Sequence, residues 1–177
     1  MLAKRLKVPA STVKTIVQSL SPSFDQPESS VSQAVTVTGH SKATRTLYSV
    51  FDAWGFDAAY CDEPTPHTSG ATVVLAGDYV ATPLWSAALS HTQTLHLPVI
   101  FSDLSIAMEP LVTPGSTPCL SCQELWRRDE EPEWLSTGSQ LWDTPAPTAT
   151  AHGAHREAAL CAMLLGELGP HDTDPPP

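Results

Sequence analysis

The sequence predicts an α/β fold, with a Rossmann-like sheet domain over residues 33–170. Two continuous apolar stretches, Thr72–Ala76 and Leu97–Ser102, are typical of strands that are buried on both faces of a parallel sheet. A β-branched stretch, Val35–Thr38, stops at a glycine and precedes a helical pattern. Strand and helix patterns alternate after this point, as they do in βαβ units, and the chain is long enough for one such core.

Four further elements complete the predicted domain. A helix is expected over Ala43–Gly55, where apolar residues recur on one face and a glycine ends the pattern. A short strand is expected over Asp57–Tyr60. The next helix is expected over Pro83–Leu95 and begins with a proline, as first turns often do. The strongest amphipathic pattern in the chain predicts a last helix over Ala154–Leu168.

The sequence predicts less regular structure between and after these elements. Met108–Pro118 suits a strand that turns at its Pro-Gly pair. The acidic run Asp129–Glu133 is most simply a solvated loop. Glu131–Thr150 is rich in Pro, Thr, Ser and Trp and is expected to be mostly irregular. Residues 171–177 are expected to be a disordered tail because of their composition.

The sequence of residues 1–21 predicts two short helices around a turn. A polar linker is expected over residues 22–32. Val8 ends the first helix, since the residue before a proline is pushed out of the α region. Ser11 or Thr12 can cap the second helix. Its apolar positions recur at i, i+3, i+4 and i+7, and they are Val13, Ile16, Val17 and Leu20. This is the pattern of the turn and second helix of a partial winged-helix unit.

Composition limits the functions that the chain can have. The 9 basic and 19 acidic residues give a formal net charge of -10, which opposes binding to nucleic acid or to an anionic membrane surface, because both need a basic face. A DNA-binding alternative is weak, since Lys14 is the only basic residue in the second N-terminal helix. No run of about 20 apolar residues predicts a transmembrane helix, and no signal peptide is apparent. Four cysteines are too sparse for a disulfide scaffold, so a cytoplasmic location is expected.

The segment after the first predicted strand lies where a dinucleotide-binding loop would be. It reads GHSKATRT from Gly39, with one glycine where the G-x-G-x-x-G fingerprint needs three. His40 and Lys42 put their side chains where phosphates would lie. Asp62 or Glu63 supplies an acidic residue near the end of the second strand. We therefore expect a degenerate nucleotide loop, with a small nucleotide-binding or adenylating enzyme as the alternative.

Cys119 and Cys122 form a C-x-x-C pair. Two thiolates at this spacing can reach one tetrahedral zinc ion, so the pair is a zinc half-site. Further ligands within the chain could come only from Cys161, His152 and His155, and Cys161 is expected in the core. A zinc-binding regulator stays open as an alternative, whereas a redox pair is less favoured, because no thioredoxin-like helix pattern follows. No motif such as G-x-S-x-G or H-E-x-x-H indicates a catalytic centre.

The segment around these cysteines resembles a stretch of the ThiF-like (E1-like) partner proteins of azol(in)e peptide biosynthesis. In that family the stretch has the form P-C-L-x-C-x-x-L-x-R-x-D-x-x-P-x-W. The matching positions are Pro118, Cys119, Leu120, Cys122, Leu125, Arg127, Asp129, Pro132 and Trp134. The preceding segment from Thr72 is similar to the family in the order and spacing of its elements. Leu2–Leu20 looks like the helical end of the family's RiPP recognition element, which is a small winged-helix unit.

The resemblance implies a non-catalytic scaffold with an E1-like fold. Such proteins bind the leader region of a ribosomally made TOMM precursor peptide and present it to a YcaO cyclodehydratase. The YcaO enzyme uses ATP to close cysteine, serine or threonine into azolines. The leader is expected to dock as an added strand, with contacts on the second N-terminal helix at Thr12, Val13, Lys14, Ile16 and Val17. A homodimer, or a hetero-complex with the YcaO enzyme, is expected.

The chain departs from the family pattern in two places. It begins at the helical part of the recognition element, so the preceding β-hairpin is expected either to be absent from a shortened protein or to come from another chain. Relatives with a structural zinc use two cysteine pairs. The second pair would follow the last helix, where this chain reads PHDTDPPP. The pair Cys119–Cys122 is thus expected to be half of a zinc site.

Overall fold

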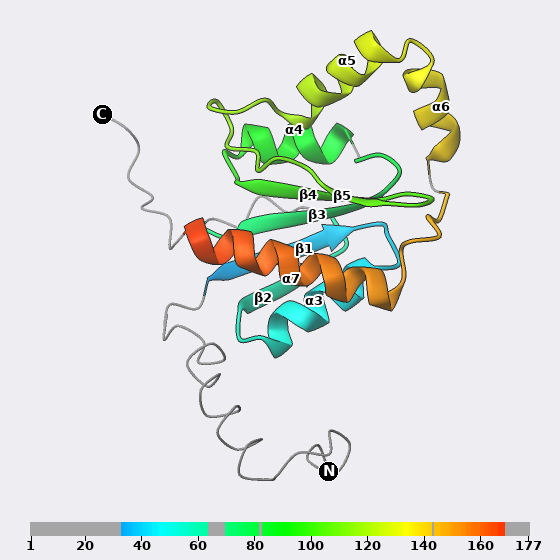
Figure 1. Cartoon of the computed structure of the whole chain (residues 1–177). Coiled ribbons are helices and arrows are strands. Elements are labelled where there is room, and N and C mark those ends of the chain that lie inside the picture. Colours follow the sequence, from blue (N-terminus) through cyan, green and yellow to red (C-terminus); the bar gives the residue numbers. More distant parts are fainter. Residues whose placement is uncertain (1–32, 64–69, 82, 143, 169–177) are drawn as a thin grey trace, which may run out of the picture. The chain divides into compact units, whose positions relative to one another are not determined.

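The computed structural model describes residues 33–63, 70–81, 83–142 and 144–168 (Figure 1). This part of the chain forms a mixed α/β domain with one five-stranded sheet and five helices. The strands are β1 (Ala34–Gly39), β2 (Asp57–Cys61), β3 (Thr72–Asp78), β4 (His96–Phe101) and β5 (Ile106–Met108). The helices are α3 (Thr44–Ala53), α4 (Pro83–His91), α5 (Leu120–Glu130), α6 (Trp134–Leu141) and α7 (Ala151–Leu168). The unit predicted over residues 1–21, the linker over 22–32 and the tail over 171–177 lie outside the described residues.

The sheet has the strand order β2-β1-β3-β4-β5. The first four strands are parallel, and β5 runs antiparallel to β4 at the edge. The predicted α/β class and its parallel strands are therefore confirmed. The predicted strand over Met108–Pro118 is mostly wrong, because β5 ends at Met108 and only Val112 makes a further bridge, to His96.

Helices cover both faces of the sheet (Figure 1). On one face α3 and α7 pack together over Val35 and Val37 of β1. Successive side chains of a strand point to opposite faces, so Val74 of β3 joins this cluster while Leu75 packs with Trp85 of α4 on the other face. Burial on both faces explains why β3 and β4 consist almost entirely of apolar residues. None of the described helices is long and apolar enough to span a membrane.

The helix α4 ends at His91, four residues before its predicted end. The chain reverses at Gln93, which has a left-handed backbone with φ of 55°. The amide of Thr94 then donates to the carbonyl of Leu89 at 2.9 Å, and the amide of Gln93 donates to Ser90 at 3.2 Å. This pair of bonds is a Schellman C-cap, in which glycine is the usual left-handed residue. A glutamine there carries no stop signal, so the sequence pattern predicts too long a helix.

Two helices lie partly where the sequence predicts a solvated loop and mostly irregular structure, so both predictions are only partly right. The end of α5 takes in Asp129 and Glu130, and α6 lies within residues 131–150. The α6 sequence WLSTGSQL has weak helix propensity because of its Ser, Thr and Gly residues. Gly138 is buried, and a Cβ there would lie 3.3 Å from Cγ1 of Val80. Packing on the turn after β3 therefore stabilises α6, which local propensity cannot reveal.

Candidate functional site

A hollow of about 140 Å³ lies at the carboxyl edge of the sheet, where β1 and β3 end. The strand order reverses at this point, since β2 lies on one side of β1 and β3 on the other. Open α/β sheets bind ligands at such switch points. His40 and Lys42 line the hollow from the loop after β1, and Asp78 lines it from the end of β3. Trp142 and Pro145 close it from the segment after α6.

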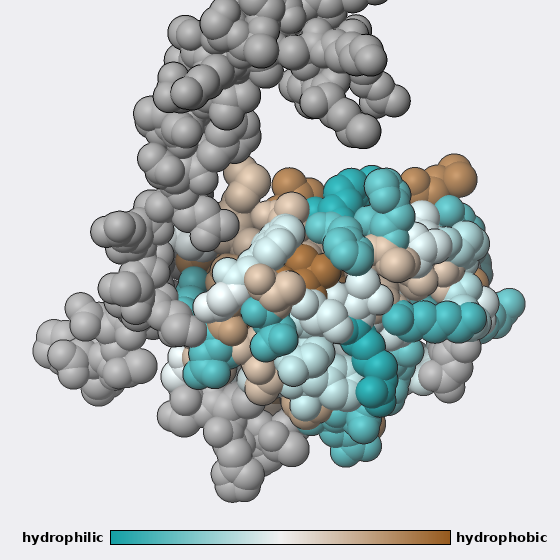
Figure 2. Space-filling view, turned by 90° about the horizontal axis from the view of Figure 1, so that it is seen from below, coloured by the Kyte–Doolittle hydropathy of each residue, from teal (hydrophilic) through white to brown (hydrophobic). Residues whose placement is uncertain are grey.

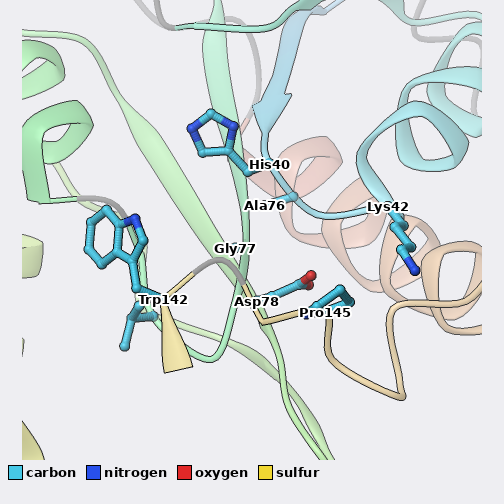
Figure 3. A pocket seen from close by; sticks show the side chains of 8 residues that line it. His40, Lys42, Ala76, Gly77, Asp78, Trp142 and Pro145 are labelled. Carbon is cyan, nitrogen blue, oxygen red and sulfur yellow. The ribbon is translucent and has the colours of Figure 1, made fainter. Parts of the chain in front are cut away.

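The side chains of His40 and Lys42, which the sequence places where phosphates would lie, leave the loop in different directions (Figure 3). The ring of His40 lies against Trp85 of α4, with 4.4 Å between the ring centroids. The side chain of Lys42 is exposed and points toward the opposite side of the strand end. His40 and Lys42 therefore line one hollow, as their positions in the sequence predict, but they do not converge on one point where a phosphate group could be held.

The backbone of this loop is occupied by its own contacts. A Cβ at Gly39 would lie only 2.0 Å from the carbonyl oxygen of Ala76, so the glycine is required where β1 approaches β3. The hydroxyl of Ser41 accepts a hydrogen bond from the amide of Ala43 at 3.2 Å, and its carbonyl accepts one from the amide of Thr44 at 3.1 Å. Amides at the start of α3 that would otherwise bind a phosphate are thus already paired.

Charge and size also disfavour a nucleotide in the hollow. The Oδ1 atom of Asp78 is buried and has no hydrogen-bond partner among the described residues. A carboxylate at this position repels an anion. Asp62 does not line the hollow; it accepts a hydrogen bond from Tyr60, which raises the pKa of that phenol. The volume is below the roughly 300–1,000 Å³ of common small-molecule pockets. The hollow suits a small polar group better than a nucleotide.

The cysteine pair lies at the first turn of α5. The sulfurs of Cys119 and Cys122 are 3.5 Å apart, and both residues are free thiols. The sulfur of Cys119 makes no capping hydrogen bond of ordinary geometry. The nearby amide of Cys122 nevertheless favours its thiolate and lowers the pKa of Cys119, as helix N-termini commonly do. The pair can present two sulfur ligands to one metal ion.

The described residues do not complete a metal site around this pair. No group of three His, Cys, Asp or Glu side chains among them is placed to hold an ion. Cys161 is buried in the core, as predicted, with its sulfur 3.8 Å from that of Met108. Burial, helped by the charge of Glu157, raises the pKa of Cys161 to about 12. A zinc ion at Cys119 and Cys122 would need ligands from outside the described residues.

Three residues of the matched segment hold α5 in place. Leu120 is buried at the start of α5 in the cluster beneath α4. Arg127 donates to the carboxylate of Glu109, just after β5, and to Oε1 of Glu124 at 2.8 Å. The indole of Trp134 in α6 donates to the same Glu124 carboxylate, and its ring lies 5.7 Å from the guanidinium carbon of Arg127. These contacts join α5 to the sheet and to α6.

The residues expected to contact a leader peptide lie outside the described residues. They are Thr12, Val13, Lys14, Ile16 and Val17. Trp142 and Pro145, which close the hollow, were not predicted from the sequence. No local pattern marks these two residues, because they reach the end of β3 only through the packing of α6.

Comparisons with known proteins gave matches among solved structures alone. No family model matches the sequence, and no curated protein matches it. The chain is similar to a heterocyclase solved in complex with substrate and cofactor, with 18% identity and a TM-score of 0.61, over 98% of this chain and 29% of that chain. It is also similar to the heterocyclase TruD, with 19% identity and a TM-score of 0.53, over 98% and 31%. A chain of the E. coli microcin synthetase McbBCD complex matches with 14% identity and a TM-score of 0.55, over 97% and 69%.

What these proteins share with the chain is the fold. The identities of 14–19% are too low to transfer residue roles. The chain spans about three tenths of the length of the two heterocyclase chains, so most of each heterocyclase lies outside the shared part.

Proposed function

We propose that the chain is a non-catalytic scaffold in azoline formation. It binds the leader region of a precursor peptide and presents it to a YcaO cyclodehydratase. The observation that carries this proposal is the likeness in fold to two heterocyclases and to a chain of a microcin synthetase complex. The motif over Pro118–Trp134 supports the same group of proteins from the sequence alone.

The geometry at the carboxyl edge supports a scaffold rather than an enzyme. A protein that adenylates a substrate must hold the phosphates of ATP, usually on free backbone amides at a helix N-terminus. Here amides at the start of α3 are paired with Ser41, and the hollow contains the carboxylate of Asp78. In this proposal the YcaO partner binds and uses the ATP.

The cysteine pair supports a second, smaller proposal. Cys119 and Cys122 supply two thiolates of a zinc site, and the remaining ligands come from outside the described residues. The support is the separation of 3.5 Å between the sulfurs and the lowered pKa of Cys119. Metal analysis of the purified chain tests this, since zinc that is lost in a Cys119→Ser, Cys122→Ser variant would support the site. Absence of bound zinc from the wild-type chain and its complexes would contradict it.

Leader binding is tested by substitutions in the predicted second N-terminal helix. The proposal predicts that the double substitution Thr12→Glu, Lys14→Glu weakens the affinity for a fluorescently labelled leader peptide by about tenfold or more, because it places acidic groups in the docking groove. Fluorescence anisotropy measures this affinity. Lys42→Glu also replaces a lysine by a glutamate, on the sheet domain, and should leave the affinity unchanged.

Two outcomes would count against the proposal. An unchanged affinity in the Thr12→Glu, Lys14→Glu variant would remove the N-terminal helix as the leader site. Micromolar binding of ATP by the chain alone, with no binding of leader or YcaO enzyme, would instead favour the small nucleotide-binding alternative.

A further inference from the structure

Large apolar side chains are exposed along α5 and α6. Leu125 and Trp126 of α5 are 50% and 62% exposed, and Leu135 of α6 is 57% exposed. We call these three residues the α5–α6 face. Both helices lie on the outside of the domain, beyond α4 (Figure 1). A helix that packed only within its own domain would turn such residues inward, so an apolar face of this kind marks an interaction surface.

A hollow of about 230 Å³ lies within this face. Its floor is apolar, because Leu120 and Ala81 are buried there, and its walls include Leu125 and Leu135. Protein interfaces gain most of their affinity from a few large side chains that enter recesses of this kind. The hollow therefore fits an apolar anchor side chain of a partner protein.

Acidic residues lie where α5 ends and the chain turns into α6, and we call them the acidic rim of the face. Asp129 and Glu130 end α5, and Glu131 and Glu133 follow before α6. Arg128 is paired with its neighbour Asp129 at 2.7 Å, which leaves the other three carboxylates without a salt bridge to a described residue. Two copies of this face would bring like charges together, which disfavours self-association. The acidic rim instead fits a partner whose apolar surface is bordered by Lys and Arg.

Exposed apolar residues are also present elsewhere, but on the face seen from below (Figure 2) they do not form one large patch. Figure 2, seen from below relative to Figure 1, shows hydrophilic and hydrophobic residues mixed, with the most hydrophobic residues only in small separate groups.

The two heterocyclases of the same fold carry most of their length outside the shared part. In those proteins the shared unit is thus joined to a much larger body of polypeptide.

We propose that the α5–α6 face is the docking surface for the cyclodehydratase, and that it receives an apolar, basic-rimmed surface of that enzyme. This inference rests on the proposed scaffold function. The partner inserts an apolar side chain into the hollow between α5 and α6, while its basic residues pair with the acidic rim. Leader binding is then left to a different part of the chain.

The test measures the affinity of the full chain for a separately purified YcaO enzyme, by calorimetry. The double variant Leu125→Ser, Trp126→Ser should bind at least about tenfold more weakly, since it removes one wall of the hollow and the exposed ring of the neighbouring Trp126. The matched control is Trp54→Ser, Met163→Ser, which changes the exposed Trp at the C-cap of α3 and the exposed Met163 of α7. It should keep the wild-type affinity, and thermal melting should show that both variants fold.

The outcomes separate this inference from the proposed function. If the wild-type chain binds the enzyme and the Leu125→Ser, Trp126→Ser variant binds equally well, the docking surface is wrong while the scaffold function stands. If the wild-type chain does not bind the enzyme at all, the scaffold function itself fails. If the wild-type chain is a dimer in solution that these substitutions dissociate, a second copy occupies the face and the inference is overturned.

Salt provides an independent readout. Attraction between an acidic rim and a basic partner is screened by ions, so the affinity of the wild-type chain should fall as sodium chloride is raised. An affinity that does not fall with salt would overturn the charge complementarity on which the choice of partner rests.

Discussion

At the scale of single residues, Gly39 is the one glycine of the G-x-G-x-x-G fingerprint that this loop keeps. The structure shows why it is needed even though the other two are missing. Its backbone has φ of 153°, and the carbonyl of Ala76 fills the place that a Cβ would take. The glycine therefore serves the pairing of β1 with β3, and its presence does not require a phosphate nearby. This explanation needs the neighbouring strand, which the sequence around Gly39 does not contain.

We predict that Gly39→Ala lowers the free energy of unfolding by roughly 3 kcal/mol, from backbone strain and the clash with Ala76. Urea unfolding followed by circular dichroism measures this loss. Gly55→Ala is the control, because Gly55 also has a positive φ of 85° but nothing lies within 4 Å of an added Cβ. It should cost about 1 kcal/mol. Equal losses in the two variants would contradict the close approach of the strands.

The burial of His96 should make the stability of the domain depend on pH. Its ring is buried, Nδ1 donates to the carbonyl of Thr94 at 2.9 Å, and Nε2 has no partner among the described residues. Burial lowers the pKa of His96, so its contribution to stability is present above the unfolded pKa of about 6.5 and is lost as the pH falls below it. Denaturant unfolding between pH 8 and pH 5 should show this decline.

The decline should be smaller in His96→Gln and unchanged in His155→Gln, which alters an exposed histidine of α7. The largest slope that one such group can give is about 1.4 kcal/mol per pH unit. A wild-type decline that His96→Gln leaves intact would show that other groups cause the acid sensitivity.

At the scale of elements, α5 and α6 depend on side-chain contacts more than on their own propensity. Arg127 contacts Glu109 beside β5, Glu124 within α5 and the ring of Trp134 in α6. These groups are partly exposed, so water screens the pairs and each is worth little in overall stability. Their main effect is to fix where the two helices lie.

We predict that Arg127→Met increases amide hydrogen exchange in α6 while the strands keep their protection. Overall stability should fall by only about 1 kcal/mol, because the charges are partly solvated. Arg128→Met is the matched control, since among the described residues Arg128 pairs only with its exposed neighbour Asp129, and it should change neither quantity. If α6 of the Arg127→Met variant exchanges its amides at the wild-type rate, the contacts of Arg127 do not hold this helix.

The elements also show how far the sequence can be interpreted. The parallel strands β1, β3 and β4 and the helices α3 and α7 follow from apolar periodicity, because the core selects the residues that face it. The end of α4 depends on a left-handed Gln93, and α6 depends on contacts of Gly138 with Val80. The first is a local C-cap that lacks the usual glycine, and the second is a tertiary effect, so neither leaves a sequence pattern that predicts it.

At the scale of the whole molecule, the two candidate sites differ in how predictable they are. The position of His40 and Lys42 at a strand end follows from the βαβ pattern, and the structure places both at the hollow. The divergence of their side chains, and the closure of the hollow by Trp142, follow only from the assembled fold. The spacing of the C-x-x-C pair likewise predicts two close sulfurs, whereas the helix beside it and its exposed apolar face do not follow from that motif.

The central claim is that the chain supports azoline formation without performing the chemistry. Its most direct test is reconstitution of the YcaO enzyme and its precursor peptide with and without this chain, with ATP present. Mass spectrometry counts the water molecules lost by the precursor as azolines close. The account predicts that water loss becomes much faster when the chain is added and that the chain alone neither modifies the precursor nor consumes ATP. Equal water loss with and without the chain would contradict the account.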